Sequence, residues 1–231
     1  MILDKKSFLK QGDGMKNPTA TPGASRRRGY AGRSAEALSA ERRQRLMDSA
    51  MALFGTEGYL PTTVEKLCQH AKVTTRHFYE HFRDREALLI ALFEAILEDT
   101  RQQVTRILED TAVPFAQRFE AALAVFLACH LDDPRRARIT TQEILGVSLH
   151  AEAARNVVIN RFAALIESHL RAALPPGALT PGNYRILAVG IVGAMHELQI
   201  AWLNGSLGMS REALQTELSS LARVMVGMSG R

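Results

Sequence analysis

The amino-acid sequence predicts an all-α protein in which a small three-helix head precedes a larger helical body, with about nine helices in total. From Ser39 onward, apolar residues recur at spacings of three and four, which is the period of one face of an α-helix. Prolines open several of these segments and glycines follow their ends, as is typical of helix boundaries. No segment of the sequence keeps the strict alternation of a β-strand.

The expected head contains helices at residues 40–57, 63–70 and 75–81. The first is amphipathic, because one of its faces collects Leu46, Ser49, Ala50, Leu53 and Phe54. Gly58 stands where a glycine commonly ends a helix. Thr62 and Glu65 fit a capping box for the second helix, and Thr74 is the expected cap of the third.

The expected body begins with a long helix that Asp84 caps and that runs to about Asp110. Five more helices are expected at 115–131, 135–148, 151–174, 182–204 and 211–227. Their boundaries follow from Pro114, Pro134 and Pro181 at helix starts, and from Asn204-Gly205 at a helix end. The chain therefore divides into an arm at 1–38, a head at 39–84 and a body at 85–231.

Composition excludes several classes of protein. Apolar residues make up 46% of the chain and charged residues 23%, which is ordinary for a globular protein. The uncharged apolar stretches at 121–131 and 186–196 are too short to span a bilayer, and the N-terminus lacks the apolar region of a secretory signal. Cys68 and Cys129 cannot form a disulfide framework. We therefore expect a cytoplasmic protein that has no membrane partner.

Charge is unevenly distributed along the chain. The net charge of +5 is the sum of +7 over the first 85 residues and −2 over the remainder. A basic first third favours a polyanionic partner, although a solvated basic surface would give the same count.

Two short helices joined by the tight turn at Ala71-Lys72-Val73 form a helix-turn-helix pattern. In such a motif the second helix enters the major groove of DNA and presents its N-terminal residues to the bases. Phe78 and Phe82 are expected to face the core with Leu67 and Val64. The outward residues would then be those that donate hydrogen bonds, namely Thr75, Arg76, His77 and Tyr79.

The segments LMDSAMALFGTEGY (46–59) and TTVEKLCQHAKVTTRHFYEHFRDREALL (62–89) resemble the TetR/AcrR family of transcriptional regulators. The resemblance covers about 45 residues almost contiguously, and the remainder of the chain has no such signature. It implies a homodimer that binds a palindromic operator and leaves it when a small molecule binds to the body. A regulator without an effector, either an activator or a nucleoid-type protein, is the alternative, followed by a helical enzyme or scaffold.

The resemblance also implies roles for individual residues. Phosphate contacts are expected from Thr63, Thr74, Tyr79, His81 and Arg85, and base contacts from Thr75, Arg76 and His77. Arg76 stands where the family often has glycine or proline, and both a guanine contact and a phosphate contact remain open for it. A competing interpretation of His77 and His81 as metal ligands lacks a third ligand, so we expect no metal.

Two other positions depart from the family pattern. Lys72 replaces a usual glycine, so the turn either avoids the left-handed conformation or tolerates its strain. Cys68 stands where alanine is common and is expected to be a small buried apolar side chain.

The arm carries Arg26, Arg27, Arg28 and Arg33 among prolines and glycines, and we expect it to be disordered. Its length would let these arginines reach an adjacent minor groove, although a solvated tail has the same composition. Met15 is an alternative start of the chain.

Enzyme motifs are absent from the sequence, which contains no Gly-x-Ser-x-Gly, no P-loop and no Gly-x-Gly-x-x-Gly. His196-Glu197 opens a zinc-protease pattern, but Ile200 stands where the second histidine is required. We therefore expect neither catalysis nor a cofactor.

The helix at 182–204 is apolar on nearly all sides, which predicts burial on all sides. The resemblance implies that this helix and the last one pair with their mates in a homodimer; a central helix of a monomer is the alternative. It also implies an effector pocket in the body. The candidates are polar and aromatic side chains within apolar stretches: Phe126, His130, Asn160, Phe162, His196 and Trp202.

Overall fold

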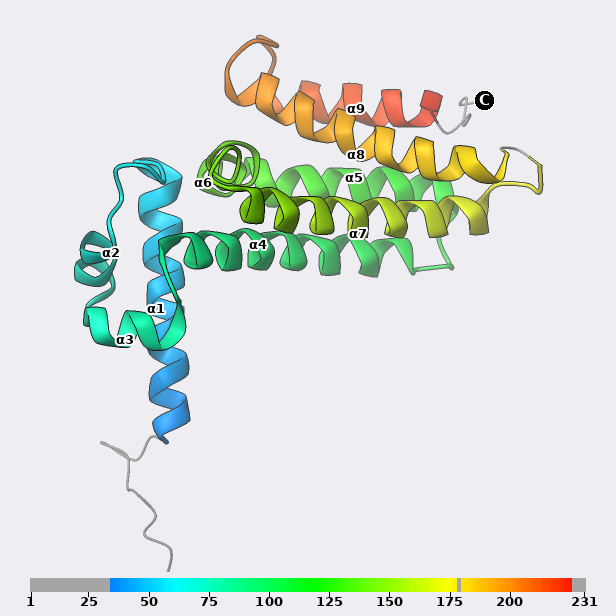
Figure 1. The fold of residues 1–231 in the computed structure, drawn as a ribbon. Helices are drawn as coiled ribbons and strands as arrows, with labels where there is room; N and C mark the ends of the chain where they lie inside the picture. The colour runs from blue at the N-terminus through cyan, green and yellow to red at the C-terminus, as the bar shows by residue number, and fades with distance from the viewer. Residues whose placement is uncertain (1–33, 178–179, 226–231) are drawn as a thin grey trace, which may run out of the picture.

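The computed structural model describes residues 34–177 and 180–225, and within them it is helical without strands. The elements in chain order are α1 Ala35–Thr56, α2 Val64–Ala71, α3 Thr75–His81, α4 Arg85–Leu108, α5 Phe115–Leu131, α6 Pro134–Arg138, the π-helix η2 Ile139–Glu143, α7 Leu149–Ala173, α8 Pro181–Leu203 and α9 Arg211–Met225. Figure 1 shows α1–α3 at one end of the molecule, with α4, α5, α7, α8 and α9 side by side as the body. The predicted all-α class is confirmed.

Helix starts in the head are fixed by side-chain caps. Ser34 accepts a hydrogen bond from the Ala37 amide, so α1 begins five residues earlier than expected and takes in the end of the predicted arm. The cap of α2 is Thr63, not Thr62 as predicted, because the Thr62 hydroxyl is buried and donates to the Gly58 carbonyl at 2.7 Å. The predicted cap of α3 is confirmed, since Thr74 accepts from the His77 amide.

The predicted helix at 135–148 is wrong in its second half. After Arg138 the chain widens into the π-helix η2, which ends at Glu143. The Thr140 and Thr141 hydroxyls donate to main-chain carbonyls of the preceding turn at 2.9 and 2.7 Å, competing with regular helical bonding. Gly146, at φ +68°, then turns the chain toward α7.

Two apolar cores run through the molecule. The first joins the head to the near half of α4 and to η2, and includes Phe54, Phe78, Phe93 and Ile144. The second fills the far end of the body around Leu108, Leu127 and Leu170. Because the first core continues past residue 84, the head is packed against the body and does not hang from a linker.

The head packs closely against the body at Gly55 of α1. A Cβ atom added there would lie 2.4 Å from the Cβ of Arg135 on α6. Only glycine therefore lets α1 pack this closely against α6.

Helix α8 is not buried on all sides within one chain. Tyr184, Ala188, Ile191 and Met195 face the core, whereas Ile186 and Val189 are 70% and 44% exposed. By length and composition alone, residues 182–203 could cross a membrane, and only 22% of the tested window is buried. A single helix of this kind is weak evidence for a membrane protein, because helices of other proteins meet the same criterion.

Candidate functional site

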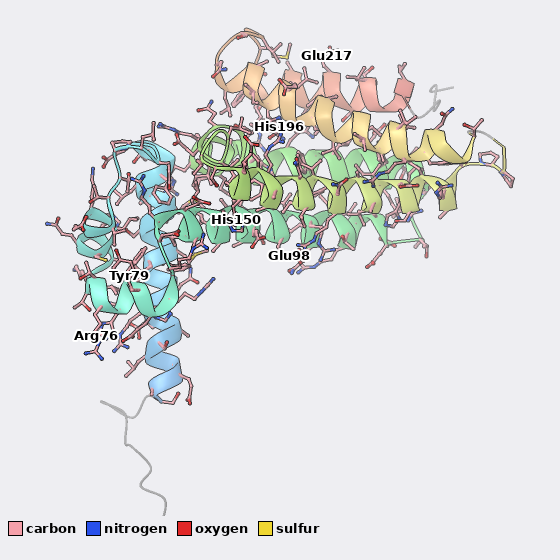
Figure 2. The ribbon with its side chains drawn as sticks, viewed as in Figure 1. Arg76, Tyr79, Glu98, His150, His196 and Glu217 are labelled. Atoms are coloured by element: carbon pink, nitrogen blue, oxygen red, sulfur yellow. The ribbon has the colours of Figure 1, made fainter. Side chains whose placement is uncertain are left out.

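Helix α3 presents a polar face to solvent. Thr75, Arg76 and Tyr79 are exposed, and the side chain of Arg76 is 88% exposed. In Figure 2, Arg76 projects from α3 away from the body. On the opposite face, Phe78 and Phe82 are buried in the core, as predicted. The centres of their rings lie 5.9 Å apart.

The predicted phosphate contacts Thr63 and Thr74 are both exposed N-cap residues. Each side chain satisfies an amide of its own helix, and Thr74 Oγ1 also lies 2.9 Å from Nδ1 of His77. This contact holds the half-buried His77 ring against the start of α3. The two hydroxyls therefore stand at helix N-termini, where the helix dipole favours an anion such as phosphate.

His81 is partly a packing residue. Its Nε2 is buried without a hydrogen-bond partner, and burial lowers the pKa of the ring. Glu80 raises that pKa in part, whereas the nearby cations Arg43 and Arg42 of α1 lower it. The ring therefore favours its neutral form, which weakens the predicted phosphate contact.

Arg85 has a structural role that the sequence did not reveal. Its Nη1 donates to the carbonyls of Leu60 at 3.2 Å and Thr62 at 2.5 Å. The guanidinium also lies 4.1 Å from the centre of the Tyr59 ring. Arg85 thus ties the start of α4 to the loop between α1 and α2, and only its remaining N–H groups are left for a phosphate.

Two further sets of residues named from the sequence are the arginines of the arm and the histidines considered as metal ligands. The arm arginines Arg26, Arg27, Arg28 and Arg33 lie outside the described residues. Within the described ranges, no group of three or more metal-ligating side chains is close enough to hold an ion, so His77 and His81 have no third ligand there.

The body encloses a pocket between α4, α5, η2, α7 and α8. Its empty space, including the part open to solvent, amounts to about 830 Å³. Four of the six predicted ligand residues line it: Phe126, His130, Phe162 and His196. The wall is otherwise mostly apolar, which fits the general character of small-molecule sites.

Asn160 and Trp202 do not line this pocket. Asn160 is exposed and accepts a hydrogen bond from Arg185 at 2.6 Å, on the outer seam between α7 and α8. The indole N–H of Trp202 donates to the Met209 carbonyl at 3.0 Å and braces the turn before α9. Helix periodicity shows that a face is covered but not which neighbouring element covers it, so the sequence did not reveal that both side chains lie outside the pocket.

The sequence missed four polar lining residues, namely Thr140, Thr141, Arg155 and Gln199. Arg155 and Gln199 lie on α7 and α8, and the two threonines lie on the unpredicted π-helix. Nothing in their local sequence distinguishes them from surface residues.

His130 is the most perturbed titratable group in the pocket. Burial lowers its pKa to about 4, and its Nδ1 lies 2.9 Å from the Phe126 carbonyl. His196 also has a lowered pKa, caused first by burial and then by Arg155. Both rings are therefore neutral at pH 7, and the cation within this pocket wall is Arg155.

Residues 46–92 match the family model described as bacterial regulatory proteins, tetR family. The HTH-type transcriptional regulator HbdR of Aromatoleum sp. (strain CIB) is 29% identical over 163 residues, which are 69% of each chain. Among solved structures, FadR of Bacillus subtilis in complex with stearoyl-CoA has a TM-score of 0.67 at 19% identity, covering 78% of this chain and 96% of that one. The fatty acid degradation regulator FadR of Bacillus halodurans also has a TM-score of 0.67, at 19% identity, with 82% and 97% covered.

The comparisons agree with the geometry of the head. The family match spans both helices of the helix-turn-helix and the start of α4, and the two solved structures share the overall helical fold. Residues 46–92 therefore carry the DNA-binding domain of the tetR family of bacterial regulatory proteins, and the chain as a whole is similar to transcriptional regulators that contain this domain.

Proposed function

We propose that the protein is a homodimeric repressor that binds a palindromic operator and leaves it when a small apolar molecule enters the pocket. The observation that carries this proposal is that the same two elements line the pocket and pack against the DNA-binding head. Helix α4 and η2 both line the pocket, and both pack in the core that contains the head. A ligand that changes their positions would therefore change the position of α3.

The DNA-binding part of the proposal rests on the exposed face of α3. Thr75, Arg76 and His77 would contact base edges, and Tyr79 with the capping threonines would contact phosphates. Two recognition helices of a dimer would engage half-sites about 34–36 Å apart or a multiple of this distance. The arm arginines would add minor-groove contacts, and residues 39–84 and 85–231 would act as DNA-binding and effector-binding domains.

The exposed apolar surface of α8 and α9 supports the homodimer. Ile186 and Val189 on α8 are exposed, as are Leu221 and Val224 on α9. Exposed Gly190 and Gly193 lie on the same side of α8 and would allow close packing with a second copy. A dimer would cover this surface and would remove it from water in the cytoplasm.

Release of DNA requires that the effector bind the two conformations with different affinity. The mostly apolar wall of the pocket suits a small apolar molecule, and the structural neighbour from Bacillus subtilis is in complex with stearoyl-CoA. Such a molecule would bind best when α4 is displaced from its operator-bound position. No catalytic step is part of this function.

The proposal is tested by fluorescence anisotropy with labelled DNA that flanks the gene of this protein. Specific binding at moderate salt, followed by release when an effector is added, is the expected result. Specific binding that no apolar compound relieves would favour the alternative, a regulator without an effector. Equal affinity for all DNA sequences would contradict operator recognition.

A further inference from the structure

The polar groups of the pocket are sorted to one end. Helices α4 and α7 run away from the head, and α5 and α8 run back toward it (Figure 1). His130 is therefore near the head end of α5, Arg155 near that of α7, and Gln199 near that of α8. Thr140 and Thr141 of η2 lie at the same end.

The opposite end of the pocket is apolar. It is lined by Val104 and Leu108 of α4, Phe119 and Leu123 of α5, and Ile166 of α7. From Phe93 to Leu108 the lining follows α4 for roughly 22 Å, at 1.5 Å per residue. An elongated ligand with one polar end would therefore have a single favourable direction.

The head end contains an unsatisfied donor. Gln199 is 2% exposed, and its Nε2 is buried without a hydrogen-bond partner. Leaving such a group unpaired is costly, so the site favours a ligand that supplies an acceptor.

The same end contains a cation without a carboxylate partner. Among the described residues, no acidic side chain lies within ion-pair distance of Arg155, whose Nη2 instead lies 3.4 Å from Nε2 of His196. His196 can accept this hydrogen bond only in its neutral form, which the lowered pKa favours. A positive group beside neutral histidines in an apolar cavity is suited to an anion.

From this arrangement we infer that the ligand of the pocket is an elongated apolar carboxylate, bound with its carboxylate at the head end against Arg155 and Gln199. The inference rests on the proposed function, since it takes the pocket to be the effector site. The apolar chain lies along α4 toward Leu108, and the carboxylate lies beside η2, the element that contacts the head.

The direct test is isothermal titration calorimetry of the full-length protein with decanoate, decanol, decylamine and decanoyl-CoA. Decanoate is expected to bind about 10- to 100-fold more tightly than decanol, because hydrogen bonds to a charged group are the stronger kind. Decylamine is expected not to bind. Decanoyl-CoA separates the free acid from its thioester: weaker binding of the thioester supports the inference, and binding only of the thioester overturns it.

Two variants locate the carboxylate. Arg155→Met should reduce the affinity for decanoate about 10- to 100-fold and leave that for decanol unchanged. Arg161→Met is the matched control, because Arg161 is exposed on the same helix and does not line the pocket. Gln199→Leu removes the unpaired donor, so it should keep the fold and lower the preference for acid over alcohol.

Equal affinities of acid and alcohol, or equal effects of Arg155→Met and Arg161→Met, would overturn the inference. Operator binding is measured separately on the same samples. If decanoate binds as expected but does not release DNA, the repressor mechanism fails while the ligand assignment stands.

Discussion

The Tyr59 main-chain N–H donates to Oε2 of Glu143 at 2.7 Å, although the two residues are 84 positions apart. Oε1 of the same carboxylate accepts from Nε of Arg138 at 2.7 Å, and Nη1 of Arg138 donates to the Thr56 carbonyl at 2.6 Å. These bonds join the end of α1 to the π-helix whose threonines line the pocket. Glu143 therefore connects the DNA-binding head to the pocket wall.

Replacing Glu143 with alanine should weaken this connection. The Tyr59 amide and Arg138 would lose their acceptor, and the unfolding free energy should fall by about 1–3 kcal/mol. Effector affinity should change little, but the effector should reduce DNA affinity less than in the wild type, because the coupling between sites is smaller. Urea unfolding and anisotropy measure the two effects. Glu152→Ala, an exposed position on α7, is the control; identical coupling in both variants would contradict the assigned role.

Arg76→Ala should weaken operator binding by roughly 1–3 kcal/mol, because its charged side chain is 88% exposed on α3. Its exposed ion pair with Glu80, at 3.6 Å, adds little stability, so the fold should persist. Anisotropy against operators with single base changes distinguishes the two open roles. Relaxed preference at one position per half-site indicates a base contact, and uniform weakening indicates a phosphate contact.

Lys72→Gly should stabilise the protein. Lys72 has φ 52° and is the sole non-glycine residue with positive φ in the described part of the chain. The left-handed conformation costs about 1–2 kcal/mol for an L-residue, and the entropy of glycine in the unfolded chain offsets part of the gain. We expect a net gain of about 0.5–1 kcal/mol in urea unfolding. Lys72→Ala keeps the Cβ and should show no comparable gain; if it does, the charge and not the backbone is responsible.

His130 should make stability depend on pH between about 4 and 6.5. Burial lowers its folded-state pKa to about 4, so in this range the unfolded chain binds a proton that the folded chain does not. The contribution is fully present above the unfolded pKa and is lost as pH falls through this window, by about 3 kcal/mol. His130→Gln should flatten the pH profile of unfolding by urea. His150→Gln, at an exposed position, should not, and equal profiles for both would contradict the assignment.

Val189→Arg should dissociate the proposed homodimer. Val189 is 44% exposed on α8, beside the glycines that would permit close packing with a second copy. A charged side chain there would be buried without a partner in the interface. Sedimentation velocity is expected to show a monomer. Val157→Arg provides a matched control, since Val157 is 48% exposed on α7, and its sedimentation should equal that of the wild type.

The sequence by itself determined the all-α class, the caps at Thr74 and Asp84, and the outward face of α3, because these depend on residues within a few positions of one another. Only the tertiary structure decided that Arg85 holds the loop before α2, that Trp202 faces away from the pocket, and that the chain widens at Thr140. Arg85 contacts a loop more than 20 positions away in the chain, and η2 packs against α1, α4 and α8, so neighbouring residues alone did not predict these features. The spacing of apolar residues predicts that a helix face is covered but not which element covers it. The polar end of the pocket, which combines residues of α5, η2, α7 and α8, is therefore defined only by the packing of these helices.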